Sequence, residues 1–138
     1  MNETELKDFL QSHKVAWAAR EKIRDEIFRV RCQLLSPGGG RLDGMPHGSG
    51  VSDRVGTGVI RLDKLQAEHK AKSAEMDRIK QQIEHLTTTL SPMERELIHA
   101  RYILHQRWDC IAKRLHYSER HIKRLHGNIL HKLADGDA

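Results

Sequence analysis

Residues 90–133 read LSPMERELIHARYILHQRWDCIAKRLHYSERHIKRLHGNILHKL, and this stretch decides the fold. Three amphipathic segments follow one another in it, separated by short breaks. The first begins at Ser91, with Pro in the first helical position and Glu three residues after the cap, which together form a capping box. The second begins near Trp108, and the third begins after Ser118, a suitable N-cap. The stretch therefore predicts three short helices packed into one unit.

The apolar residues around the second break have the spacing of a helix-turn-helix. Ala112 is small where two helices must cross closely, and Leu115 and Ile122 can meet beneath the turn. His116 occupies the position that is glycine in many such units because the backbone there is left-handed, so we expect some strain. Cys110 is expected in the core of the unit rather than as a nucleophile. The expected inner face of the third helix consists of Ile122, Leu125, Ile129 and Leu133.

With these positions buried, the third helix turns a polar face outward, as in helices that enter the major groove of DNA. Arg120 and Arg124 lie four residues apart on this face, and arginine pairs well with guanine O6 and N7. Glu119 suits either cytosine N4 or the helix N-terminus, and the backbone N–H groups at Ser118 suit a phosphate. The remaining basic residues are better placed for phosphates, which position a protein without reading the base sequence. The predicted DNA-binding residues are Ser118, Glu119, Arg120, Lys123, Arg124, Gly127, Lys113, Arg114 and Lys132.

The distribution of charge indicates the same segment as the binding site for a polyanion. The chain of 138 residues has a net charge of +5, and residues 107–134 carry seven basic residues against two acidic ones. The surplus of this segment therefore equals that of the whole chain. A local basic excess points to a polyanion such as nucleic acid, although a solvated basic surface would have the same composition.

Two long helices are expected before this unit. Residues 2–35 begin with a capping box formed by Asn2 and Glu5, and residues 59–90 form the second helix. Eight of the ten glycines lie in residues 36–58, which we interpret as a flexible linker because they match no phosphate-binding loop. Each helix carries a heptad seam, so the seams should pair within a hairpin or between two chains. The seam positions are Leu6, Phe9, His13, Ala16, Arg20, Ile23, Ile27, Val30 and Leu34 in the first helix, and Leu62, Leu65, His69, Lys72, Met76, Ile79, Ile83, Leu86 and Leu90 in the second.

The stretch from Leu90 to Leu133 resembles region 4 of sigma-70-type transcription factors, and most strongly the small phage-encoded sigma-like regulators of the ArpU/RinA kind. The matching features are Leu90-Ser91, Arg101-Tyr102, Trp108-Asp109-Cys110-Ile111-Ala112 and Tyr117-Ser118. This resemblance implies that the third helix reads promoter DNA and that bacterial RNA polymerase is a partner. The chain has no aromatic-rich segment like the promoter-melting region of a full sigma factor, so a regulator or accessory factor is expected.

Enzyme and metal sites are not expected. His116, His121, His126 and His131 are five residues apart, which turns each by about 140° around a helix, so they cannot converge on one ion. The sequence contains no HExxH or CxxC motif. No apolar run is long enough for a transmembrane helix or a signal peptide, and the two cysteines suit a reducing cytoplasm. We therefore expect no catalytic residue, no metal, no cofactor and no membrane association.

The sequence thus predicts an all-α protein with two domains. Residues 1–90 form a coiled-coil-type helical hairpin with its linker at 36–58, and residues 91–138 form a sigma region 4-like helix-turn-helix domain. The expected function is sequence-specific binding of double-stranded DNA by a transcriptional regulator of a phage or prophage, in the cytoplasm of a bacterial host. A homodimer through the heptad seams, or recruitment by RNA polymerase, should strengthen the binding of a single helix-turn-helix. Two alternatives stay open: a DNA-packaging subunit like the small terminases, which would form rings, and a helical module for an acidic partner protein.

Overall fold

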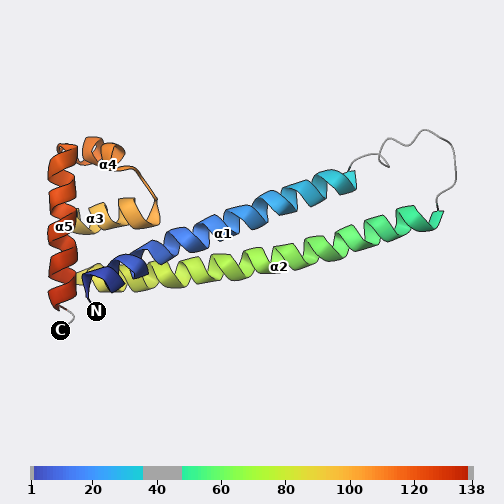
Figure 1. Cartoon of the computed structure of the whole chain (residues 1–138), viewed down its shortest axis with the longest axis horizontal. Coiled ribbons are helices and arrows are strands. Elements are labelled where there is room, and N and C mark those ends of the chain that lie inside the picture. Colours follow the sequence, from blue (N-terminus) through green and yellow to red (C-terminus); the bar gives the residue numbers. More distant parts are fainter. Residues whose placement is uncertain (1, 36–47, 137–138) are drawn as a thin grey trace. The chain divides into compact units, whose positions relative to one another are not determined.

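The computed structural model describes the backbone of residues 2–35 and 48–136 and the side chains of residues 2–35 and 55–136. All regular structure in these ranges is helical, which confirms the predicted all-α class (Figure 1). In chain order the elements are α1 (Glu3–Leu35), α2 (Gly48–Leu86), the 3₁₀ turn η2 (Thr87–Thr89), α3 (Pro92–Ile98), the π turn η3 (His99–Ile103), α4 (Trp108–Leu115) and α5 (Glu119–Gly136). No helix in the described ranges is long and apolar enough to span a bilayer.

The chain divides into two compact units, and this division differs from the predicted domain boundary at residue 90. One unit comprises Met1–Trp17 together with Glu75–Ala138, and the other comprises Ala18–Ala74. Both α1 and α2 therefore contribute residues to each unit. We call the first the helix-turn-helix unit and the second the hairpin unit.

In the hairpin unit the two helical segments run antiparallel and meet through the predicted seams. Arg20 Nη1 donates to Ser73 Oγ at 3.4 Å, whereas Arg61 forms an ion pair with Glu26. From Arg20 to Glu26 the chain advances along α1, whereas their partners on α2 go back from Ser73 to Arg61, as in an antiparallel pair. The apolar core of this unit consists of the buried Ile27, Val30 and Leu65, with the half-buried Ile23, Leu34 and Leu62 packed against it.

The glycine-rich segment is partly helical, which corrects the predicted linker. Helix α2 begins at Gly48, so residues 48–58 are helical, and the earlier part of the predicted linker lies outside the described residues. Close packing explains one of these glycines. A Cβ atom added to Gly58 would lie 2.6 Å from Cδ2 of Leu34, so a larger residue there would require the Leu34 side chain to move. The high glycine content hid this helix because glycine is a poor helix former in isolation.

The helix-turn-helix unit has one apolar core to which both ends of the chain contribute. Leu6 and Leu10 from α1 and Ile83 from α2 are buried there with residues of α3, η3, α4 and α5. The other buried members are Leu90, Leu97, Ile98, Ala100, Tyr102, Ile111, Ala112, Ile122, Ile129, Leu130 and Leu133. The sequence left open whether the seams pair within one chain or between two, and the structure pairs them within one chain.

Candidate nucleic-acid interface

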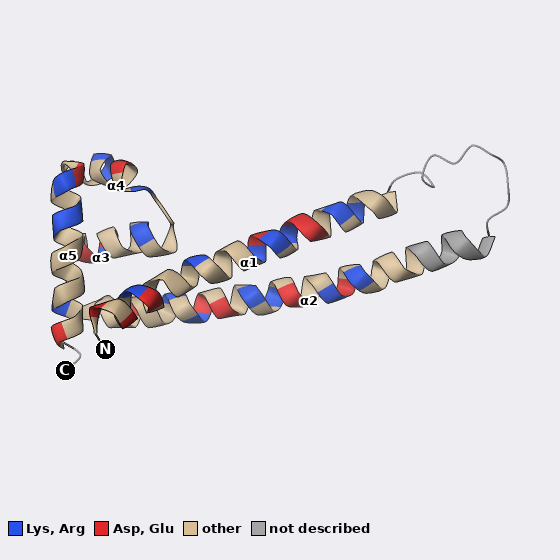
Figure 2. Cartoon of the chain, viewed as in Figure 1, with Lys and Arg blue, Asp and Glu red and all other residues tan. Residues whose placement is uncertain are grey.

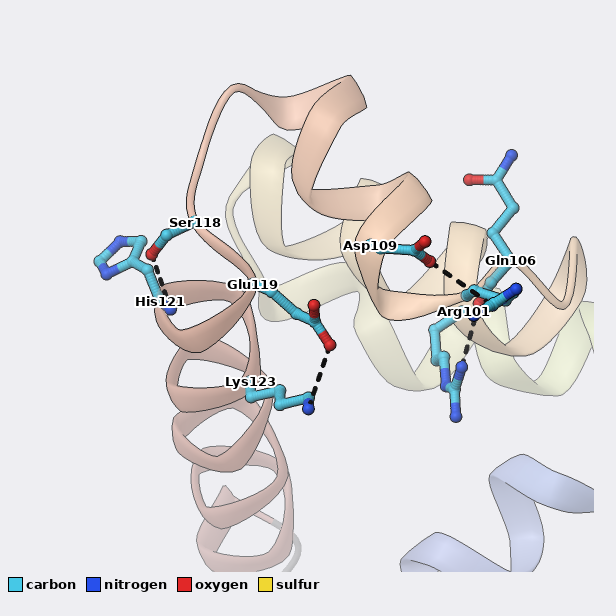
Figure 3. A network of polar contacts seen from close by, with 8 residues as sticks. Arg101, Gln106, Asp109, Ser118, Glu119, His121 and Lys123 are labelled. Carbon is cyan, nitrogen blue, oxygen red and sulfur yellow. Dashed lines mark hydrogen bonds and ion pairs between the residues drawn. The ribbon is translucent and has the colours of Figure 1, made fainter.

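The turn between α4 and α5 has the backbone geometry that a helix-turn-helix requires. His116, which follows α4, adopts a left-handed conformation with φ 62°, as the sequence predicts. The N–H of Tyr117 donates to the carbonyl of Ala112 at 3.0 Å, and the N–H of His116 donates to that of Lys113 at 3.4 Å. These two bonds form a Schellman motif, which ends α4 and reverses the chain. Ser118 then caps α5, because its Oγ accepts from the N–H of His121 at 3.2 Å (Figure 3).

The packing beneath this turn follows the prediction with one exception. Ile111, Ala112 and Ile122 are buried, and Leu115 lies half-buried against the same core. Cys110, however, is exposed, so its predicted place in the core is wrong. Cys110 is turned by about 100° from Ile111 and by about 140° from Leu115 around α4, which places it away from the side that faces the core.

An arginine joins the segment before α4 to α4 itself. Arg101 belongs to the π turn η3, and its Nη1 donates to the carbonyl of Gln106 at 3.0 Å (Figure 3). Its guanidinium carbon lies 4.3 Å from the centroid of the Trp108 ring, within range of a cation–π contact. The connector also contains His105, a second non-glycine residue with positive φ, at 57°. This strained connector was not predicted.

Two half-buried histidines make hydrogen bonds between elements of the helix-turn-helix unit. Nε2 of His126 lies 2.5 Å from the hydroxyl of Tyr102, and Nε2 of His105 lies 3.1 Å from Nδ1 of His13. Burial lowers the pKa of His126 to about 4, with a further contribution from Arg101. Burial likewise raises the pKa of Tyr102, so the tyrosine keeps its proton and forms a hydrogen bond with His126.

The pKa of His105 is also lowered to about 4, by burial first and then by the positive charge of its neighbours His13, Lys14 and Arg101. Both histidines are thus neutral near pH 7. The third histidine of this region, His13, is a seam residue of α1 that is almost fully buried.

All nine residues predicted to bind DNA are exposed. Arg120, Lys123 and Arg124 lie in the first two turns of α5, where Figure 2 shows the basic residues of this helix gathered next to α4. The later turns of α5 are mostly uncharged in the same view. We call the exposed basic residues of α4 and of the first two turns of α5 the basic face; it consists of Lys113, Arg114, Arg120, Lys123 and Arg124.

Ion pairs divide the predicted residues into two groups. Lys123 Nζ lies 3.2 Å from Oε1 of Glu119, one turn away (Figure 3). Arg114 Nη2 lies 3.2 Å from Oε1 of Glu96. In the described part of the chain, Lys113 and Arg120 have no such partner. These last two cations are therefore free to meet an anion without first breaking an ion pair.

Lys132 stands apart from the basic face. Its Nζ lies 3.4 Å from Oε1 of Glu94, the residue that closes the capping box of α3. Although burial raises the pKa of Glu94, hydrogen bonds from Ser91 and the charge of Lys132 outweigh it and leave the pKa below its usual value. Lys132 thus joins α5 to the start of α3, which gives it a structural task that the sequence did not indicate.

Two further polar residues belong to the outward surface of α5 and were not predicted. Asn128 is exposed one turn after Arg124, and asparagine pairs with adenine in the major groove. His121 Nδ1 lies 3.1 Å from Nη2 of Arg124, and its ring packs against that of Tyr117 with centroids 4.9 Å apart. Asn128 follows Arg120 and Arg124 at intervals of four residues, so the sequence could have predicted that it shares their face. The contact of His121 with Arg124 depends on side-chain conformation and could not be predicted.

Comparison with protein families gives one match, over residues 56–135, to the family described as "Protein of unknown function (DUF722)". This region covers more than half of the chain, including η2, α3, η3, α4 and nearly all of α5. The chain belongs to the DUF722 family. Comparisons of this DUF722 protein with curated proteins and with solved structures give no match. The family match thus includes the whole basic face without assigning it a ligand.

Proposed function

We propose that this DUF722 protein binds double-stranded DNA in a sequence-specific manner through α4 and α5, and that it acts as a transcriptional regulator. In this proposal α5 enters the major groove. Arg120 and Arg124 read base edges, while Lys113, Arg114 and Lys123 contact phosphates.

One observation carries the proposal: the exposed arginines of α5 lie on the outer side of a helix that follows a Schellman turn and buries Ile122 beneath it. Helix-turn-helix proteins use this arrangement to place the first turns of the second helix against base edges. The Lys113 and Arg120 side chains need no rearrangement to reach an anion, whereas Lys123 can exchange Glu119 for a phosphate. A basic surface next to a helix start is also electrostatically suited to DNA.

We further propose that the regulator is of the sigma region 4 type, encoded by a phage or prophage and working with RNA polymerase. The support is the resemblance of residues 90–133 together with the places of its motif residues in the structure. Trp108 opens α4 and contacts Arg101, and Tyr117-Ser118 forms the turn and the cap before α5. Polymerase binding would supply affinity that a single helix-turn-helix lacks.

Selection of duplexes from a random pool, followed by titration of the selected duplex at several salt concentrations, tests the DNA proposal. We expect the double variant Arg120→Ala, Arg124→Ala to lose base preference, and Lys113→Ala to weaken binding evenly and lower the salt slope by about 1. Lys132→Ala is the matched control, because this lysine pairs with Glu94 away from the basic face. Failure of the wild-type protein to bind any duplex at low salt would contradict the proposed function.

A further inference from the structure

Gly127 occupies a position where glycine brings no structural advantage. It lies in the middle of α5, which runs from Glu119 to Gly136. In a helix interior only proline is less favourable than glycine, because glycine loses the most backbone freedom on folding. A helix that carries glycine at its centre is therefore less stable than the same helix with alanine there.

Neither backbone conformation nor packing requires this glycine. The residue is part of an α-helix and does not have positive φ. A Cβ atom added to it would meet no heavy atom within 4 Å. Gly58 shows the contrast, since a Cβ there would meet Leu34 at 2.6 Å. Nothing within the described part of the chain explains why position 127 has no side chain.

The surroundings of Gly127 suggest what comes close to it. On the surface of a helix the nearest neighbours of a residue are those three and four positions away. For Gly127 these are the exposed Lys123, Arg124 and His131 and the buried Leu130, and Arg120 is exposed two turns before it. On the side toward the start of α5, Gly127 is therefore a gap next to three cationic side chains, at which the backbone of α5 is left uncovered.

We propose that a DNA strand approaches the backbone of α5 at Gly127 more closely than any side chain there would permit. This inference rests on the DNA-binding function proposed above and adds a steric requirement to it. The contact is one of van der Waals type, because the N–H of a residue in mid-helix already donates within the helix. The neighbouring Arg124 and Lys123 then reach bases and phosphates on either side of the closest point.

The test compares Gly127→Ala and Gly127→Leu with the matched control Gly136→Ala. Gly136 lies in the same helix, and a Cβ added to it also meets nothing within 4 Å. We expect Gly127→Ala to raise the melting midpoint by a few degrees, because alanine is the better helix former. Affinity for the selected duplex should nevertheless fall about tenfold, and further with leucine, while Gly136→Ala keeps wild-type affinity.

The outcomes separate this inference from the proposed function. Gly127→Leu binding as tightly as the wild-type protein would overturn the close approach and leave DNA binding intact. If Gly127→Ala had a lower melting midpoint than the wild-type protein, the fold itself would require the glycine, and the inference of a close approach by DNA would also be overturned. Absence of DNA binding by the wild-type protein would remove the proposed function, and the inference with it.

Discussion

The left-handed residue His116 makes the turn before α5 possible at a cost in stability. An L-residue with a β-carbon is disfavoured in this conformation, whereas glycine adopts it readily. We expect His116→Gly to raise the free energy of unfolding by about 0.5–1 kcal/mol, which urea denaturation would measure. The exposed His131 in α5 provides the control, since His131→Gly should lower stability by about 1 kcal/mol. A loss of stability in His116→Gly would mean that the imidazole makes a contact that outweighs the backbone strain.

Sequence reasoning at the level of single residues succeeded where the cause is local. The conformation of His116, the cap at Ser118 and the capping box at Ser91 each depend on a few neighbouring residues, and all three are present. Cys110 was predicted to lie in the core but is exposed, and its position next to the buried Ile111 in the helix already indicated this. The ion pair between Lys132 and Glu94 joins residues far apart in the chain, so no local pattern could indicate it.

At the level of elements, the connector between η3 and α4 and the helix α5 each contain a neutral histidine, His105 and His126, which makes the stability of the unit sensitive to pH. The pKa values of His105 and His126 are near 4 in the folded protein and 6.5 without the fold. Between these values the unfolded chain binds more protons, so stability falls as the pH decreases from about 6.5 to 4. We expect the melting midpoint to drop by several degrees between pH 7 and pH 5, as measured by circular dichroism.

Replacing both histidines checks the origin of this pH dependence. In the double variant His105→Asn, His126→Gln, asparagine tolerates positive φ and glutamine can still accept from Tyr102, but neither residue titrates. The drop between pH 7 and pH 5 should then be smaller than in the wild-type protein. An equal drop in both proteins would assign the pH dependence to other groups.

Most elements could be predicted because amphipathic periodicity and caps are encoded along each segment. The seam residues of α1 lie buried or half-buried as expected, from Leu6 to Leu34, and α4 and α5 begin at the predicted residues. Two features escaped the prediction. The start of α2 at Gly48 was hidden by its glycines, because glycine has a low helix propensity. The π turn η3 has no distinctive sequence signal.

At the level of the whole molecule, the helix-turn-helix is not self-contained within the predicted domain of residues 91–138. Leu10, on α1, is completely buried in the same core as Ile122 of α5. Leu10 and Ile122 are far apart in the sequence, so sequence patterns could not predict that they share a core. Periodicity shows which face of a helix a residue occupies, but not which helix packs against that face. The first 17 residues are therefore part of the unit that presents the basic face.

This dependence gives a prediction for a residue far from the basic face in sequence. Leu10→Ala should lower the free energy of unfolding of the helix-turn-helix unit by about 2–5 kcal/mol, because it leaves a cavity in its core. Fluorescence of Trp108 in a Trp17→Phe background reports this unit during urea denaturation. Val15→Ala, which truncates an exposed side chain of the same helix, should change stability by less than about 0.5 kcal/mol. If the Trp108 transition were unchanged in Leu10→Ala, residues 91–138 would fold without α1, and the predicted boundary at residue 90 would stand.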